Sequence, residues 1–186
     1  SIFQFVFQEL QQVLPSLPDQ HSNKEGNYYG RITQPVVNFL LAKLALNAEI
    51  YMYDDWTQGY ASRPKGSDIH FSVPASDASL RNGDKVDCRK LNAWETCIYY
   101  CDKLAEEGYV LESDDSFNFS THNETSKENI FTIPMDKNIY TNQFHYLFRS
   151  YHYTHGGVLG WGSENGTCAT ISTMKANHYG EADEDA

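Results

Sequence analysis

Apolar side chains recur at helical spacing in three segments of the chain. The first covers residues 2–14 and stops at Pro15, and the second, over residues 34–53, is the strongest pattern in the sequence. The third runs from about residue 91 to 107 and is followed by Gly108. Apolar residues three and four positions apart form one face of an α-helix, while proline and glycine end helices. The spacing therefore predicts three helices joined by polar connections.

The second segment is apolar around most of its circumference. Thr33 precedes it at the capping position, and Pro35 occupies its first turn, where a missing N–H costs nothing. After Pro35 its strongly polar positions are Asn38, Lys43, Asn47 and Glu49. A helix with so wide an apolar surface is typical of burial between neighbours. We therefore expect the helix over residues 34–53 to be buried between other helices.

The third segment completes a pattern of two helices separated by an insertion. Within it we expect an inward face made of Trp94, Ile98, Cys101 and Leu104 or Ala105. The insertion, residues 54–89, is rich in Gly, Ser, Asp and Pro, and such long connections are usually functional or mobile. Two buried helices of this kind are similar to one tetratricopeptide-like unit. We predict a mainly α fold of tetratricopeptide-like helical repeats, with long loops and short strands near residues 109–111 and 129–133.

The chain has the length of one domain. Its 186 residues allow a sizeable core. It opens directly on an apolar helical pattern, without a cationic segment or a small-residue cleavage site, and no apolar run is long enough to span a bilayer. We expect residues 1–186 to be a single partial domain, an internal piece of a longer protein.

A formal net charge of −11 at pH 7 narrows the classes of partner. Nucleic acid and anionic lipid both require lysine and arginine to meet their negative charge, so the composition argues against both. Neutral sugars, cations and basic proteins remain compatible with it. An acidic, soluble surface without a specific partner explains most of the charge equally well.

Aromatic side chains are abundant, with 13 Tyr, 10 Phe and 3 Trp, and they crowd together after residue 139. Flat Tyr and Trp rings offer sugar rings a stacking surface together with a polar group. Trp161 lies in the glycine-rich segment 156–162, where a large ring has few neighbours to bury it. We predict that Trp161 is exposed and contacts a ligand; the alternative is a ring that caps the core.

The loop of residues 112–118 is rich in oxygen-bearing side chains. Calcium prefers several carboxylate and carbonyl oxygens from a flexible loop, which makes Asp114 and Asp115 candidate ligands. The spacing is not that of an EF-hand, and a solvated acidic loop is the alternative interpretation.

Other chemical motifs are weak. His152 and His155 are three residues apart, yet zinc needs a third ligand, so surface histidines are the simpler interpretation. The four cysteines form no Cys-x-x-Cys pair and are best interpreted as free thiols. No nucleophile elbow, phosphate-binding loop or dinucleotide fingerprint occurs, and a glycosidase pair is defined by distance in space rather than by counting acids. We therefore predict a protein that is not an enzyme and requires no cofactor.

Four segments follow one another in a recognisable order: 30–35 (Gly-Arg-Ile-Thr-Gln-Pro), 41–51 (Leu-Ala-Lys-Leu-Ala-Leu-Asn-Ala-Glu-Ile-Tyr), 126–131 (Ser-Lys-Glu-Asn-Ile-Phe) and 165–170 (Asn-Gly-Thr-Cys-Ala-Thr). With the opening helix and the helix near residues 94–108, they resemble the SusD-like (SusD/RagB) family of outer-membrane glycan-binding lipoproteins. The resemblance covers nearly the whole chain. It depends on the order and spacing of the segments, since no single motif is decisive.

The resemblance implies a predominantly helical protein in which tetratricopeptide-like units support a glycan site built from loops. Such proteins bind sugars without cleaving them, are lipid-anchored at the outer-membrane cell surface, and work with a TonB-dependent SusC-like transporter. We expect the lipid anchor to lie outside this fragment. In starch-binding members an aromatic arc contributes to the site, and Tyr140 and Trp161 match it by order. Some members hold calcium, which again points to Asp114 and Asp115.

Three functions are therefore compared. The first is non-catalytic binding of a glycan, with α-glucan (starch-like) as the first ligand, and its delivery to a transporter. The second is a glycoside hydrolase, which would release products from polysaccharide. The third is a structural helical-repeat scaffold whose aromatic residues serve packing and a protein partner. Exposure of Tyr140 and Trp161 in one concavity would favour the first.

Overall fold

The computed structural model divides into two units, Ser1–Pro134 and Met135–Ala186. The residues that it describes are 1–53, 55–75, 88–135, 154, 158 and 170–178. In the second unit they include the helix α6 (Ile171–Ala176), which begins where the Thr170 hydroxyl accepts a hydrogen bond from the Thr173 N–H at 3.1 Å. The elements below belong to the first unit.

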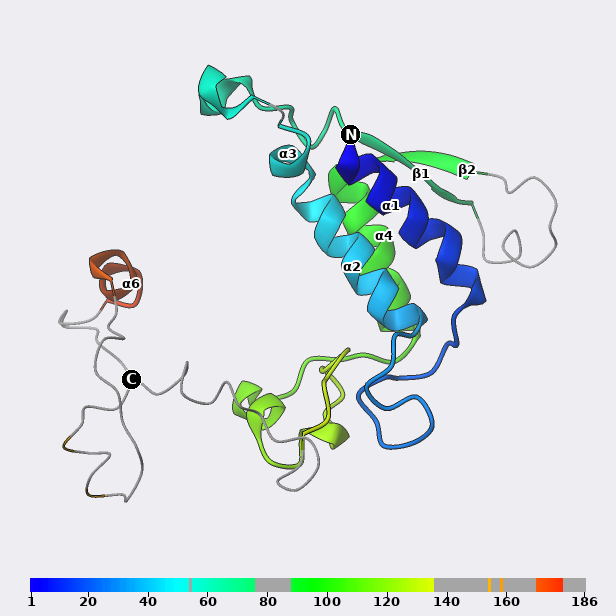
Figure 1. The fold of residues 1–186 in the computed structure, drawn as a ribbon, viewed down its shortest axis with the longest axis vertical. Coiled ribbons are helices and arrows are strands. Elements are labelled where there is room, and N and C mark those ends of the chain that lie inside the picture. Colours follow the sequence, from blue (N-terminus) through cyan, green and yellow to red (C-terminus); the bar gives the residue numbers. More distant parts are fainter. Residues whose placement is uncertain (54, 76–87, 136–153, 155–157, 159–169, 179–186) are drawn as a thin grey trace. The chain divides into compact units, whose positions relative to one another are not determined.

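The first unit consists mainly of helices and carries one two-stranded sheet in its described part (Figure 1). Its helices are α1 (Ile2–Val13), α2 (Gln34–Leu46), the single turn α3 (Ala48–Tyr51) and α4 (Ala93–Glu106). Short 3-10 helices span Leu14–Ser16, Trp56–Gln58, Tyr60–Ser62, Asp115–Phe119 and Asn123–Thr125. Strands β1 (His70–Pro74) and β2 (Cys88–Asn92) pair antiparallel. α2 packs along α4, and α1 lies against α2, so the structure is mainly helical, as the spacing predicts.

Capping boxes fix the first turns of α1 and α4. The Asn92 side-chain oxygen accepts a hydrogen bond from the Glu95 N–H, and the Glu95 carboxylate accepts one from the Asn92 N–H, both at 2.9 Å. Ser1 and Gln4 form the same reciprocal pair at the start of α1. Each box satisfies two backbone N–H groups that a helix start leaves without partners. Local sequence alone therefore determines where these two helices begin.

The helix expected over residues 34–53 is two helices, because it is interrupted at Asn47. α2 begins after Thr33, whose backbone is extended, with Pro35 in the first turn. The Thr33 side chain makes no capping hydrogen bond, contrary to expectation. At the other end the Asn47 side-chain amide donates to the Lys43 carbonyl at 2.9 Å. Asparagine competes for backbone groups in this way and ends helices.

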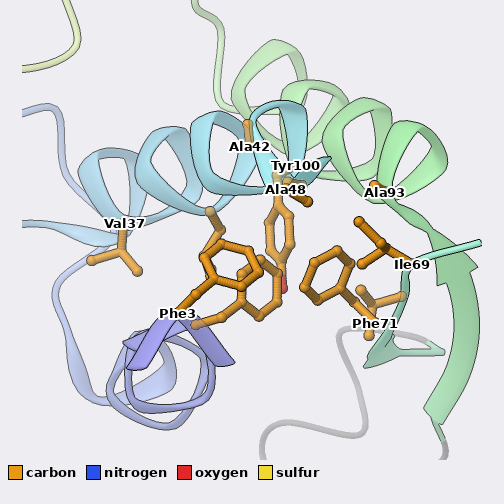
Figure 2. Close-up of a cluster of buried hydrophobic side chains, with 12 residues drawn as sticks. Phe3, Val37, Ala42, Ala48, Ile69, Phe71, Ala93 and Tyr100 are labelled. Atoms are coloured by element: carbon orange, nitrogen blue, oxygen red, sulfur yellow. The ribbon is translucent and has the colours of Figure 1, made fainter. Parts of the chain in front are cut away.

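The core lies between α1, α2, α4 and β1 (Figure 2). The Phe7 ring is at its centre: it stacks on Phe71 with 4.3 Å between ring centroids and meets Tyr100 edge-on at 6.3 Å. The buried members of the cluster are Phe3, Phe7, Val37, Leu41, Ala42, Ala45, Ala48, Ile69, Phe71, Val73, Ala93 and Tyr100. Three of the four alanines lie on or just after α2, and small side chains there allow its close approach to α4.

A strand occupies part of the segment in which the sequence predicts only a loop. Phe71 and Val73 of β1 are buried, whereas His70 and Ser72 are exposed, which is the alternation of a half-buried strand. The interpretation of residues 54–89 as a long connection is therefore wrong over β1. The short apolar alternation is hidden in the sequence by the surrounding Gly, Ser and Pro.

The short strands expected near residues 109–111 and 129–133 are not formed. One backbone hydrogen bond, from the Val110 N–H to the Lys127 carbonyl at 3.1 Å, joins the segment after α4 to the later one. The Lys127 N–H, which would donate to the opposite strand in a ladder, donates instead to the Glu112 carboxylate at 2.6 Å. A carboxylate that accepts from the backbone removes a donor from the strand ladder, so pairing does not extend.

α4 faces the core with residues other than those expected. Ala93, Thr96, Tyr100 and Leu104 are buried, whereas Trp94, Ile98 and Cys101 are exposed. Of the expected inward positions, Leu104 alone is buried and Ala105 is exposed. Ala93, the first residue of α4, is fully buried in the core cluster, and a helix rotated to bury Trp94 would expose it. The expected burial of α2 on all sides is also wrong, because Phe39 and Leu46 are exposed.

Hydrogen bonds made by polar side chains hold the segment after α4 to the loop before α2. The Asn23 amide donates to the Ser126 carbonyl at 2.8 Å, and the Ser126 hydroxyl donates to the Asn118 side-chain oxygen at 2.7 Å. The Asn118 amide in turn donates to the Glu128 carboxylate at 2.9 Å. Asn23, Asn118 and Ser126 are buried, so these bonds form in a setting where losing one partner is costly. They fix the loops that flank the end of α4.

Candidate functional site

A pocket of about 390 Å³ opens where α1 and its 3-10 extension meet the start of α2 and the end of α4. Its volume is within the range of small-molecule sites. Three carboxylates line it, from Asp19, Glu106 and Glu107, together with the ammonium group of Lys103. Lys103 forms an ion pair with Glu106 at 3.1 Å. The pocket is therefore acidic.

Amide and phenol groups also line the pocket. Gln11 donates both of its side-chain N–H groups, to the Ser72 carbonyl at 2.8 Å and to the Tyr100 hydroxyl at 2.9 Å. Gln34 donates to the Leu17 carbonyl at 2.7 Å. These bonds tie the connection after α1 to α2 and α4. They also direct the amide donors into the protein.

Asn38 is the most deeply buried polar residue of the pocket, with 4% of its surface exposed. Its side-chain N–H donates to Glu107 Oε1 at 3.3 Å. Asn38 Oδ1 and Glu107 Oε2 are buried as well, and neither accepts a hydrogen bond from the described residues. Buried polar atoms almost always have a partner, and leaving one without costs about 1–3 kcal/mol. The two acceptors therefore mark a position where a ligand with donor groups would be stabilised.

Burial raises the pKa of Glu107 to about 7. The nearby Asp19 raises it further, because two like charges repel, while the hydrogen bond from Asn38 and the charge of Lys103 lower it. Burial raises the pKa of the Tyr100 phenol as well, so Tyr100 stays neutral at physiological pH. At neutral pH the pocket thus holds a glutamate close to its titration midpoint.

We expect Glu107→Gln to flatten the pH dependence of stability. In the folded chain Glu107 holds its proton up to about pH 7, whereas an unperturbed glutamate releases it near 4.5. The contribution of Glu107 to stability is therefore full below the lower value and is lost as the pH rises to the higher one. Because Glu107 is only half-buried, solvent screening limits the decline to on the order of 1 kcal/mol.

Denaturant unfolding at pH 4, 5.5 and 7.5 measures this decline. Asp102→Asn removes a carboxylate from the same helix outside the pocket and should retain the wild-type profile. A Glu107→Gln variant with an equally steep decline would contradict the raised pKa.

The described lining of the pocket contains none of the residues that the sequence singles out as sites. Tyr140 and Trp161 are outside the described residues, as are His152 and His155. Asp114 and Asp115 are exposed at the start of a 3-10 helix, where Asp114 accepts a hydrogen bond from the Ser116 N–H at 3.0 Å. Hydrogen bonding by the Ser116 side chain, and then by its N–H, lowers the pKa of Asp114. Within the described part of the chain, no group of three or more His, Cys, Asp or Glu side chains is placed to hold a metal ion.

The cysteines among the described residues, Cys88, Cys97 and Cys101, are free thiols, as the sequence predicts. Cys97 and Cys101 are close together on α4. Burial, and then the neighbouring Cys101, raise the pKa of Cys97 to about 11. A thiol with so high a pKa stays protonated at neutral pH and is a poor nucleophile.

The sequence does not identify the pocket residues, although it contains one signal that points to them. Asn38 interrupts the otherwise apolar face that Val37 and Leu41 form on α2. A strongly polar side chain in the middle of a buried face needs a partner, which turns out to be Glu107 at the end of α4. Because that partner is 69 positions away in the chain, only the folded structure brings the two together.

Comparison with known proteins gives no neighbour: no protein-family model, no curated protein and no solved structure matches the chain. Among the described residues, no helix has both the length and the apolar character needed to cross a membrane.

Proposed function

We propose that the chain is the helical part of a non-catalytic glycan-binding protein of the SusD-like kind. The observation that carries this proposal is the acidic, amide-lined pocket beside the half-buried Tyr99 ring. Carboxylate and amide oxygens accept hydrogen bonds from sugar hydroxyls, and a tyrosine ring offers its face to the apolar side of a sugar. The order of the sequence segments that resemble this family supports the same function.

The proposal also covers the repeat architecture, the cellular location and the partner of the protein. The helices are the start of tetratricopeptide-like repeats, and the complete protein is lipid-anchored at the outer-membrane surface, where it passes oligosaccharides to a TonB-dependent SusC-like transporter. Tyr140 and Trp161 contribute further stacking surface, with α-glucan as the first ligand to test. Asp114 and Asp115 are proposed calcium ligands, for which titration with calcium and measurement of the melting temperature is the direct test.

Trp161→Ala is expected to weaken binding of malto-oligosaccharides about tenfold or more while leaving the melting temperature nearly unchanged. A stacked aromatic ring contributes about 0.5–1.5 kcal/mol beyond its buried area, and about 1.4 kcal/mol corresponds to one decade of affinity. Calorimetric titration and a thermal melt on the same protein provide both values. A ring that caps the core gives the reverse result, with unchanged affinity and a loss of roughly 3–5 kcal/mol of stability.

Glycoside hydrolysis is a second candidate that one observation favours. Glu107, with its pKa raised to about 7 and Asp19 nearby, has the character of a general acid next to a second carboxylate. Release of reducing ends from polysaccharide separates this function from binding. The loss of that release in Glu107→Gln would assign the activity to this pocket.

A structural scaffold is a third candidate, favoured by the exposed apolar side chains of α4. Trp94 and Ile98, four positions apart, are 39% and 59% exposed. Such a stripe is the surface on which the next helix of a repeat would pack. A scaffold of this kind would bind neither malto-oligosaccharides nor polysaccharide.

A further inference from the structure

The pocket presents more hydrogen-bond acceptors than donors to a ligand. The carboxylates of Asp19, Glu106 and Glu107 can only accept hydrogen bonds when they are ionised, because they then carry no proton to donate. The side-chain N–H groups of Gln11 are engaged with protein partners. Among the described lining residues Lys103 is the one with a cationic side chain, and it is paired with Glu106. The lining therefore favours a ligand whose polar groups donate hydrogen bonds over one whose polar groups accept them.

Two of the acceptors belong to neighbouring residues of the lining that are joined by a hydrogen bond, Asn38 and Glu107. Asn38 Oδ1 and Glu107 Oε2 have no partner among the described residues, although Asn38 and Glu107 are joined through their other atoms at 3.3 Å. Asn38 is 4% exposed, so its unpaired oxygen cannot turn to bulk solvent. A group with two or more N–H bonds placed between these atoms would satisfy both.

The charges distinguish an ammonium group from a hydroxyl in this position. Asp19 and Glu107 repel each other, and a cation between them would relieve that repulsion. A charge-assisted hydrogen bond is roughly twice as strong as one between neutral groups.

We propose that this pocket binds a sugar unit bearing a free amino group, whose ammonium donates to Asn38 Oδ1 and to the Glu107 carboxylate. The inference rests on the proposed function, since the ligand is part of a glycan. It adds the chemical class of that unit: an amino sugar is preferred to its N-acetylated or neutral counterpart.

Calorimetric titration of the full chain at pH 7 and low salt compares three probes. These are a tetramer of β-1,4-linked glucosamine, the same tetramer N-acetylated, and maltotetraose. The glucosamine tetramer is expected to bind at least tenfold more tightly than its N-acetylated form, and the preference should weaken as salt is added.

Three variants assign that preference to the pocket. Glu107→Gln is expected to weaken binding of the glucosamine tetramer about tenfold, and Asp19→Asn, an exposed position that folding tolerates, several-fold. Asp102→Asn removes a carboxylate from α4 outside the pocket and should change nothing beyond a small effect of net charge. Maltotetraose has no ammonium group, so its affinity should fall less than that of the glucosamine tetramer in the two pocket variants.

Each of the other outcomes of these titrations overturns the inference. Glucosamine binding that both pocket variants leave unchanged overturns the inference. Binding of maltotetraose alone overturns it as well, while the proposed function stands. If none of the three tetramers binds, the proposed function fails together with the inference. Lysine amide serves as a further probe. If the chain binds lysine amide but does not bind the glucosamine tetramer, the pocket accepts a protein side chain, and the inference is overturned.

Discussion

Phe7→Ala is expected to destabilise the first unit by about 3–5 kcal/mol, the usual cost of truncating a large aromatic side chain in a core. The Phe7 ring is 2% exposed and contacts Phe71 and Tyr100, so its removal leaves a cavity that α1, β1 and α4 would have to close together. Total stabilities of domains are about 5–15 kcal/mol, which makes this a large fraction of the whole. Denaturant unfolding followed by circular dichroism measures the loss.

Phe5→Ala is the matched control, because it makes the same change on the same helix. Phe5 is 61% exposed, and surface substitutions usually change stability by less than about 0.5 kcal/mol. Equal losses in the two variants would mean that α1 does not contribute its Phe7 face to the core. The difference between the two values is the direct measure of that contribution.

Gly66→Ala is expected to cost about 1–3 kcal/mol, because a side chain at this position overlaps the indole ring of Trp94. The backbone of Gly66 cannot easily move away. Its N–H donates to the Glu49 carboxylate at 2.8 Å, and its carbonyl accepts from the Ala93 N–H at 3.0 Å. The indole must therefore shift, or the junction between α3 and α4 must open. Thermal and denaturant unfolding of the variant test this.

A double-mutant cycle with Trp94→Ala isolates the overlap. With the indole removed, Gly66→Ala should cost nearly nothing, so the two substitutions should be strongly non-additive. Additive effects would show that the loss arises from the backbone at Gly66 rather than from the contact with Trp94.

The candidate site could be predicted only in part from the sequence. The sequence suggests aromatic and acidic residues for binding, at Tyr140, Trp161, Asp114 and Asp115, and those assignments remain proposals. The pocket is instead made by residues from four separate segments that no motif connects. The hydrogen bond between Asn38 and Glu107, the burial of the Asn38 amide and the raised pKa of Glu107 all require that α2 lies against α4.

The sequence by itself determined the helices of this protein and several of their ends. Helical periodicity, the capping boxes at Ser1 and Asn92, and Pro35 act within a few residues, so α1 and α4 can be predicted with nearly correct bounds and α2 with a correct start. Only the tertiary structure decided which faces are buried. α4 buries Ala93 and Tyr100 in the core cluster and leaves Trp94 39% exposed. Periodicity fixes the spacing of a buried face, but the shape of the neighbouring elements selects which face it is.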